Sequence, residues 1–97
     1  AELYGKYAEK EYNAARIYER MEYYNAAIQY YENVKNTYFD SKFAPRAHYK
    51  LIELLILKEL KDEALRNIAE YIKKYPNDER VAELQELNIE LEKKANG

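Results

Sequence analysis

The feature that most constrains this chain is an internal repeat, because residues 37 positions apart, such as Ala27 and Ala64, are of matching kind. The matched segments are Ala27-Ile28 with Ala64-Leu65, Tyr31 with Ile68, Val34 with Tyr71, and Tyr38-Phe39-Asp40 with Tyr75-Pro76-Asn77. A period of this length is typical of supersecondary units that bury their apolar faces by stacking on one another. The sequence therefore predicts a stack of similar units.

Each unit is predicted to be helical, because apolar residues recur every three or four positions and no segment alternates as a strand does. The chain contains only two glycines and two prolines, which favours long helices. The predicted helices are about Glu2–Arg20, about Tyr24–Tyr38, a third that begins at Pro45, Ala64–Tyr75, and Asp78 to about Lys94. Pro45 suits the first position of a helix, and Asp62 and Asp78 are predicted N-caps.

Buried faces follow from the same spacing. In the first helix Tyr4, Tyr7, Ala8, Ala14, Ala15 and Tyr18 are predicted to form one apolar stripe. Leu51, Leu54, Leu55 and Leu57 give the third helix the most apolar surface, so it should be the central and most buried helix. Most of the twelve tyrosines are expected to fill gaps between helices, among them Tyr18, Tyr31, Tyr38, Tyr71 and Tyr75.

A pair of antiparallel helices with a small residue, Ala27 or Ala64, early in the second helix resembles the tetratricopeptide repeat. The predicted fold class is therefore all-α, a tetratricopeptide superhelix of about five antiparallel helices in one domain, residues 1–97. Repeat one covers about residues 8–41, repeat two about 45–78, and a capping helix about 78–95. A first residue other than methionine suggests a fragment of a longer protein.

Composition excludes several classes of function. Sixteen basic and eighteen acidic residues give a net charge of −2, so no overall positive field attracts nucleic acid or an anionic membrane. The absence of cysteine removes disulfides, thiolate catalysis and cysteine-based zinc sites. No apolar run approaches the roughly 20 residues of a membrane span.

Residues that carry catalytic chemistry are sparse. His48 is the single histidine, and it is predicted to be a surface side chain or one that supports its neighbours, rather than a catalytic base. The carboxylates Glu9, Glu11, Glu83, Glu86 and Glu90 are interpreted as solvated helix faces. The sequence therefore predicts no catalytic residue, no cofactor and no metal site.

Protein binding remains the favoured function. In repeats of this kind the first helix of each pair lines the concave groove, and tyrosine and arginine are enriched in protein interfaces. The candidate protein-binding residues are Glu9, Tyr12, Arg16, Glu19, Tyr30, Arg46, Tyr49 and Glu53. Tyr30, with Tyr23 and Tyr24, belongs to a second candidate surface near the turn between the first two helices.

A closer resemblance covers roughly residues 7 to 78. Its segments are Ala14-Ala15-Arg16-Ile17-Tyr18, Tyr24-Asn25-Ala26-Ala27-Ile28, Tyr38-Phe39-Asp40-Ser41, Ala47-His48-Tyr49-Lys50-Leu51, Asp62-Glu63-Ala64 and Tyr75-Pro76. These segments are similar to the carboxy-terminal repeats of the BamD family. Tyr30 stands where that family usually has arginine, and Phe39 where it has proline.

The resemblance implies a function in outer-membrane assembly. Members of the BamD family are lipoproteins of the machinery that inserts β-barrel proteins into the bacterial outer membrane, and they dock on a periplasmic POTRA domain of BamA. The resemblance therefore implies a non-enzymatic scaffold at the periplasmic face of the outer membrane, with a lipid anchor in the full-length protein. A general or designed repeat adaptor that binds another protein or peptide is the alternative.

Overall fold

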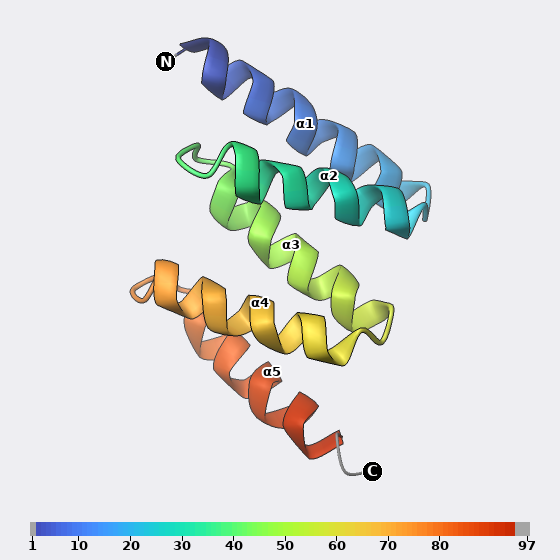
Figure 1. The fold of residues 1–97 in the computed structure, drawn as a ribbon, viewed down its shortest axis with the longest axis vertical. Helices are drawn as coiled ribbons and strands as arrows, with labels where there is room; N and C mark the ends of the chain where they lie inside the picture. Colours follow the sequence, from blue (N-terminus) through green and yellow to red (C-terminus); the bar gives the residue numbers. More distant parts are fainter. Residues whose placement is uncertain (1, 95–97) are drawn as a thin grey trace.

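The computed structural model describes residues 2–94, which form five α-helices and no strand. They are α1 (Glu2–Arg20), α2 (Tyr24–Thr37), α3 (Ala44–Leu57), α4 (Lys61–Lys74) and α5 (Val81–Lys94). Each helix reverses direction and packs on the next, so the chain forms a zigzag stack with its ends at opposite extremes (Figure 1). The stack measures 46 × 31 × 17 Å. The predicted all-α class is confirmed; residue 95, where the capping helix was expected to end, lies outside the described part.

Local sequence explains most of the helix starts. Pro45 lies in the first turn of α3, as predicted. Asp62 is not an N-cap, because α4 begins at Lys61 and Leu60 occupies the cap position without a side-chain hydrogen bond. In the first turn of α4 the Asp62 carboxylate instead lies near the positive end of the helix dipole. Asp78 does cap the turn that leads into α5, since its Oδ1 accepts the backbone N–H of Arg80 at 2.9 Å.

The turns after α1 and α3 have the same backbone geometry. Glu22 and Glu59, which are 37 positions apart, both have positive φ, at 62° and 60°. Each is followed by a backbone N–H that reaches back five residues, from Tyr23 to the carbonyl of Tyr18 and from Leu60 to that of Leu55, both at 2.9 Å. This is the Schellman arrangement of a helix C-terminus. The repeat seen in the sequence is therefore also a repeat of backbone conformation.

Replacing Glu59 with glycine is expected to raise the free energy of unfolding by about 0.5–1 kcal/mol, because the left-handed region is strained for every residue except glycine. Thermal unfolding followed by circular dichroism measures the effect. Lys58→Gly is the matched control: its φ of −83° is unstrained, so glycine there should lower the melting temperature. Equal losses in both variants would show that backbone strain at Glu59 is not what limits stability.

The core runs the length of the stack and is centred on α3. Ala44, Ala47, Leu51, Ile52, Leu54 and Leu55 of this helix are buried. On each side the repeat-related residues are fully buried in pairs: Ala27 with Ala64, Tyr31 with Ile68, and Val34 with Tyr71. The other tyrosines predicted to fill gaps, Tyr18, Tyr38 and Tyr75, are partly buried against this core.

Two residues predicted to face inward are exposed. Tyr7 is 53% exposed on α1 and Leu57 is 56% exposed in the last turn of α3. α1 carries two apolar stripes, and only the one that contains Ala8 and Ala15 packs on α2. Periodicity identifies an apolar stripe but not the neighbour that covers it.

Candidate protein-binding face

Helices α1, α3 and α5 contribute to one face of the stack. On this face Glu19 links α1 to α3. One carboxylate oxygen of Glu19 accepts a hydrogen bond from the Tyr31 hydroxyl at 2.6 Å, and the other lies 3.0 Å from Nζ of Lys50 on α3. Lys50 also pairs with Glu53, one turn further along α3, at 3.2 Å. Partial burial opposes the charge of Lys50, but these two carboxylates hold its pKa above the usual value.

Tyr49 makes the equivalent link from α3 to α5. Its hydroxyl donates a hydrogen bond to Glu83 at 2.7 Å, and the Arg80 guanidinium lies 5.6 Å from the centre of its ring. Burial and the hydrogen bond to Glu83 raise the pKa of Tyr49. We call the surface formed by Glu19, Lys50, Glu53, Tyr49, Arg80 and Glu83 the α1/α3/α5 face. Its side chains are held in place before any partner arrives, which lowers the entropic cost of binding.

Both candidate arginines, Arg16 on α1 and Arg46 on α3, remain available to bind a partner. Arg16 lines a hollow with Glu19, Arg20 and Lys50. Arg16 and Arg46 are both exposed, and neither forms an ion pair with any residue that the structure describes. Their guanidinium groups are therefore free to bind carboxylates of a partner.

Three other candidates do not join this cluster. Tyr12 is buried, because Tyr31 and Phe43 pack against its ring at centroid distances of 5.8 and 5.5 Å. The prediction that Tyr12 faces the groove is therefore wrong. The loop after α2 brings Phe43 over its ring. Glu9 is exposed beside a separate hollow at that loop. Tyr30 on α2 stacks on Tyr18 at 5.2 Å, away from the Glu19 and Lys50 pair.

Lys50 and Arg80 are residues of this face that the sequence did not single out, and Glu83 was interpreted only as part of a solvated helix face. The spacing of three residues between Lys50 and Glu53 on one helix could have indicated their ion pair from the sequence. The links from Lys50 to Glu19 and from Tyr49 to Glu83 were not visible, because they join residues more than 30 positions apart.

A buried polar cluster lies between α2, α3 and α4. His48 is completely buried, so of its two predicted positions the surface one is wrong, and Lys35 is only 6% exposed. Lys35 Nζ donates to Asn67 Oδ1 and to Glu70, both at 3.1 Å, and His48 Nε2 lies 3.1 Å from the same Asn67 oxygen. This cluster joins three helices, with Lys35 and His48 buried and the Glu70 side chain 41% exposed at its edge, so it acts in packing.

The hydrogen bonds also fix the state of the imidazole. Asn67 Nδ2 donates to the Glu63 carbonyl and Asn67 Oδ1 accepts from Lys35, so the amide orientation is set and Nε2 of His48 must be the protonated nitrogen. Nδ1 is buried without a hydrogen-bond partner. Burial, with the charge of Lys35 nearby, lowers the pKa of His48 to about 4. The ring is therefore neutral near pH 7.

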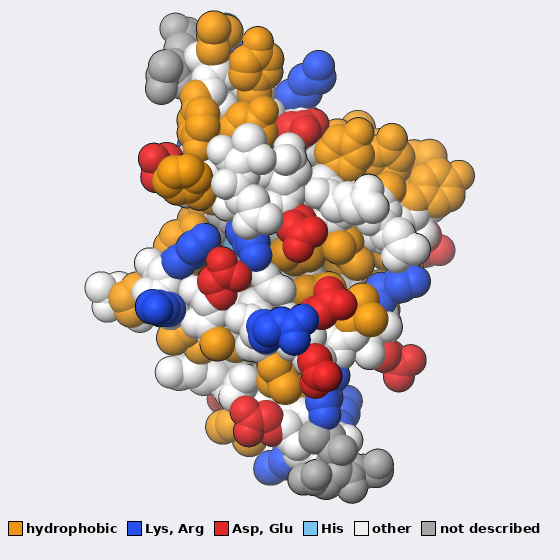
Figure 2. Space-filling view, viewed as in Figure 1, with side chains coloured by type: hydrophobic (Ala, Val, Ile, Leu, Met, Phe, Trp, Pro, Cys, Tyr) orange, Lys and Arg blue, Asp and Glu red, His pale blue; other side chains and the backbone are white. Residues whose placement is uncertain are grey.

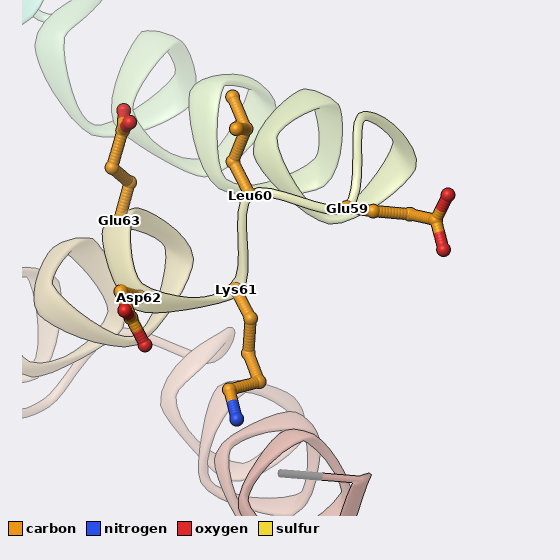
Figure 3. A pocket seen from close by; sticks show the side chains of 5 residues that line it. All are labelled: Glu59, Leu60, Lys61, Asp62 and Glu63. Atoms are coloured by element: carbon orange, nitrogen blue, oxygen red, sulfur yellow. The ribbon is translucent and has the colours of Figure 1, made fainter.

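The remaining hollows do not bring reactive groups together. At the turn between α3 and α4 a hollow is lined by residues 59–63. Figure 3 shows that Glu59 extends away from the other four side chains, and that Lys61 and Asp62 extend to the opposite side from Leu60 and Glu63. Within residues 2–94 no group of three or more histidine or acidic side chains is placed to hold a metal ion. None of the described helices is long and apolar enough to cross a membrane.

Comparison with models of known protein families gave no match, and comparison with curated proteins likewise found none.

Proposed function

We propose that this chain is a non-enzymatic protein-interaction module, and that its α1/α3/α5 face holds a segment of another protein. The observation that carries this proposal is the pair of side-chain links across that face, from Glu19 to Lys50 at 3.0 Å and from Tyr49 to Glu83 at 2.7 Å. They keep tyrosine and charged side chains of three helices in fixed positions. Ordered tyrosine and arginine side chains are typical of the residues that dominate binding energy in protein interfaces.

Charge suggests what kind of segment would bind. The carboxylates of Glu19, Glu53 and Glu83 already have partners within the chain, whereas Arg16 and Arg46 have none among the described residues. A partner with exposed carboxylates would pair with these arginines in charge-assisted hydrogen bonds. The face is therefore suited to an acidic segment of a partner protein.

The resemblance to the BamD family supplies the first partner to test. It would place the chain at the periplasmic face of the bacterial outer membrane, docked on a POTRA domain of BamA as part of the β-barrel assembly machinery. The alternative, a general repeat adaptor, uses the same face for a different protein.

Binding to the periplasmic region of BamA, measured by isothermal titration calorimetry, tests the proposal. Arg46→Ala and Tyr49→Ala are each expected to weaken binding by about 1–2 kcal/mol, as truncation of an interface anchor does. Arg66→Ala is the matched control, because Arg66 is equally exposed but lies on α4. Its affinity should be unchanged.

The possible outcomes test the identity of the partner and the position of the binding face separately. No binding by the unaltered chain would reject BamA and favour the adaptor. Binding that Arg66→Ala weakens more than Arg46→Ala and Tyr49→Ala would reject the α1/α3/α5 face. Circular dichroism of each variant shows whether the helices are intact.

A further inference from the structure

The outer side of α1 carries a row of mostly exposed residues at heptad spacing. We call it the α1 stripe, and its members are the exposed Leu3, Tyr7, Lys10 and Ile17, the partly buried Ala14, and the exposed Met21, which directly follows the last residue of the helix. Alternating steps of four and three residues place them along one side of the helix. Leu3, Tyr7, Ile17 and Met21 are between 47% and 63% exposed. Figure 2 shows hydrophobic side chains gathered at this upper end of the molecule, where α1 lies.

The repeat indicates what shape would cover this stripe. The residues 37 positions after Tyr7, Lys10, Ala14 and Ile17 are Ala44, Ala47, Leu51 and Leu54, and all four are buried. α3 packs between α2 and α4, whereas among the described residues the one extensive helix interface of α1 is with α2. The face that α3 buries against a preceding helix is therefore open on α1. A helix is the element that fits there.

Charge decides which helix would fit. Lys10 interrupts the stripe, and Lys6 and Arg20 follow one margin of it; all three are exposed, and none forms an ion pair with a described residue. On the opposite margin Glu11 is engaged by Asn33 at 2.9 Å. A helix with acidic residues along the margin that meets Lys6, Lys10 and Arg20 is complementary to this pattern.

A second copy of this chain is a poor occupant by the same reasoning. Parallel pairing of two α1 helices would set Lys10 against Lys10 of the second copy in the seam. Antiparallel pairing would bring Lys6 of one copy to Arg20 of the other along the shared margin. Like charges placed together at an interface oppose association.

We infer that the α1 stripe is a docking surface for an amphipathic helix with an acidic margin, supplied by a partner protein. The helix lies along α1 from Leu3 to Met21, a length of roughly 27 Å at 1.5 Å per residue. This surface borders the α1/α3/α5 face at Arg20, which also lines the hollow beside Arg16, Glu19 and Lys50.

Two synthetic peptides test the inference by fluorescence anisotropy. Both are 21-residue amphipathic helices with leucine at the seam positions; one has glutamate at the margin and the other has lysine at the same positions. The glutamate peptide is expected to bind at least tenfold more tightly than the lysine peptide. Lys10→Glu should reduce that preference or reverse it.

Ile17→Glu is expected to abolish binding of the glutamate peptide, since it places a carboxylate in the apolar seam. Ile89→Glu is the matched control, because Ile89 is similarly exposed, at 54%, but lies on α5. Equal binding of both peptides, or equal loss in both variants, would overturn the inference. Self-association detected by sedimentation and removed by Ile17→Glu would overturn it too, by assigning the stripe to a second copy.

Discussion

Replacing Leu51 with alanine is expected to reduce the free energy of unfolding by about 2–5 kcal/mol. Leu51 is 1% exposed at the centre of α3, between the helices on either side. Removing three carbon atoms from a packed site loses their transfer free energy and leaves a cavity that rigid helices only partly close. A domain of this size has about 5–15 kcal/mol in total, so the loss would be a large part of it.

Urea unfolding monitored by circular dichroism measures this loss. Leu57→Ala provides the control in the same helix, because Leu57 is exposed and should change stability by about 0.5 kcal/mol or less. Equal effects of the two substitutions would contradict the placement of α3 at the centre of the stack.

Acid is expected to destabilise the chain through His48. Its pKa is 6.5 in an unfolded chain and about 4 in the folded one. Between these values the unfolded state binds a proton that the folded state does not, so stability falls as the pH drops from about 6.5 to 4 and is unaffected by this group above that window. The shift corresponds to a loss of about 3 kcal/mol.

The groups around His48 explain why the ring stays neutral. Burial dominates, and Lys35 on α2 and Lys74 on α4 add positive charge, which Glu70 only partly offsets. Protonation would also place a second N–H at Nδ1, where no acceptor lies.

His48→Leu isolates the contribution of this residue. The substitution removes the titrating ring without stranding its neighbour, because Asn67 Oδ1 still accepts from Lys35. The free energy of unfolding, measured by urea titration between pH 7 and pH 4, should fall by about 3 kcal/mol less in His48→Leu than in the unaltered chain. Glu70 has its pKa held below its usual 4.5 by Lys35, in spite of partial burial, so its stabilisation is lost mainly at lower pH. Parallel pH profiles would show that His48 is not the group responsible.

The helical architecture could be predicted from the sequence because apolar period, turn residues and internal repeat agree with one another. Three of the four leucines of α3 are buried at the centre, as their number suggested, and Leu57 is exposed. The first residue of each helix was harder to predict. α4 begins at Lys61, three residues before the predicted start at Ala64. The Schellman turn at Glu59 ends α3, and the next helix follows it directly.

The candidate site was less predictable, since it depends on contacts between distant segments. Tyr12 and Tyr49 have similar positions in their helices, yet Phe43 covers Tyr12 while Tyr49 reaches Glu83. The sequence left open whether His48 lies at the surface or supports its neighbours. Its burial depends on Lys35 and Asn67, which come from two other helices.

The zigzag stack has a consequence for how the chain folds. Because each helix packs on its neighbours in sequence, nearly all stabilising contacts join segments that are close along the chain, and such low contact order favours fast folding. Stability is then distributed as a series of pairwise interfaces rather than held in one indivisible core. An end helix such as α5 can open and close again while α3, enclosed on both sides, keeps its place.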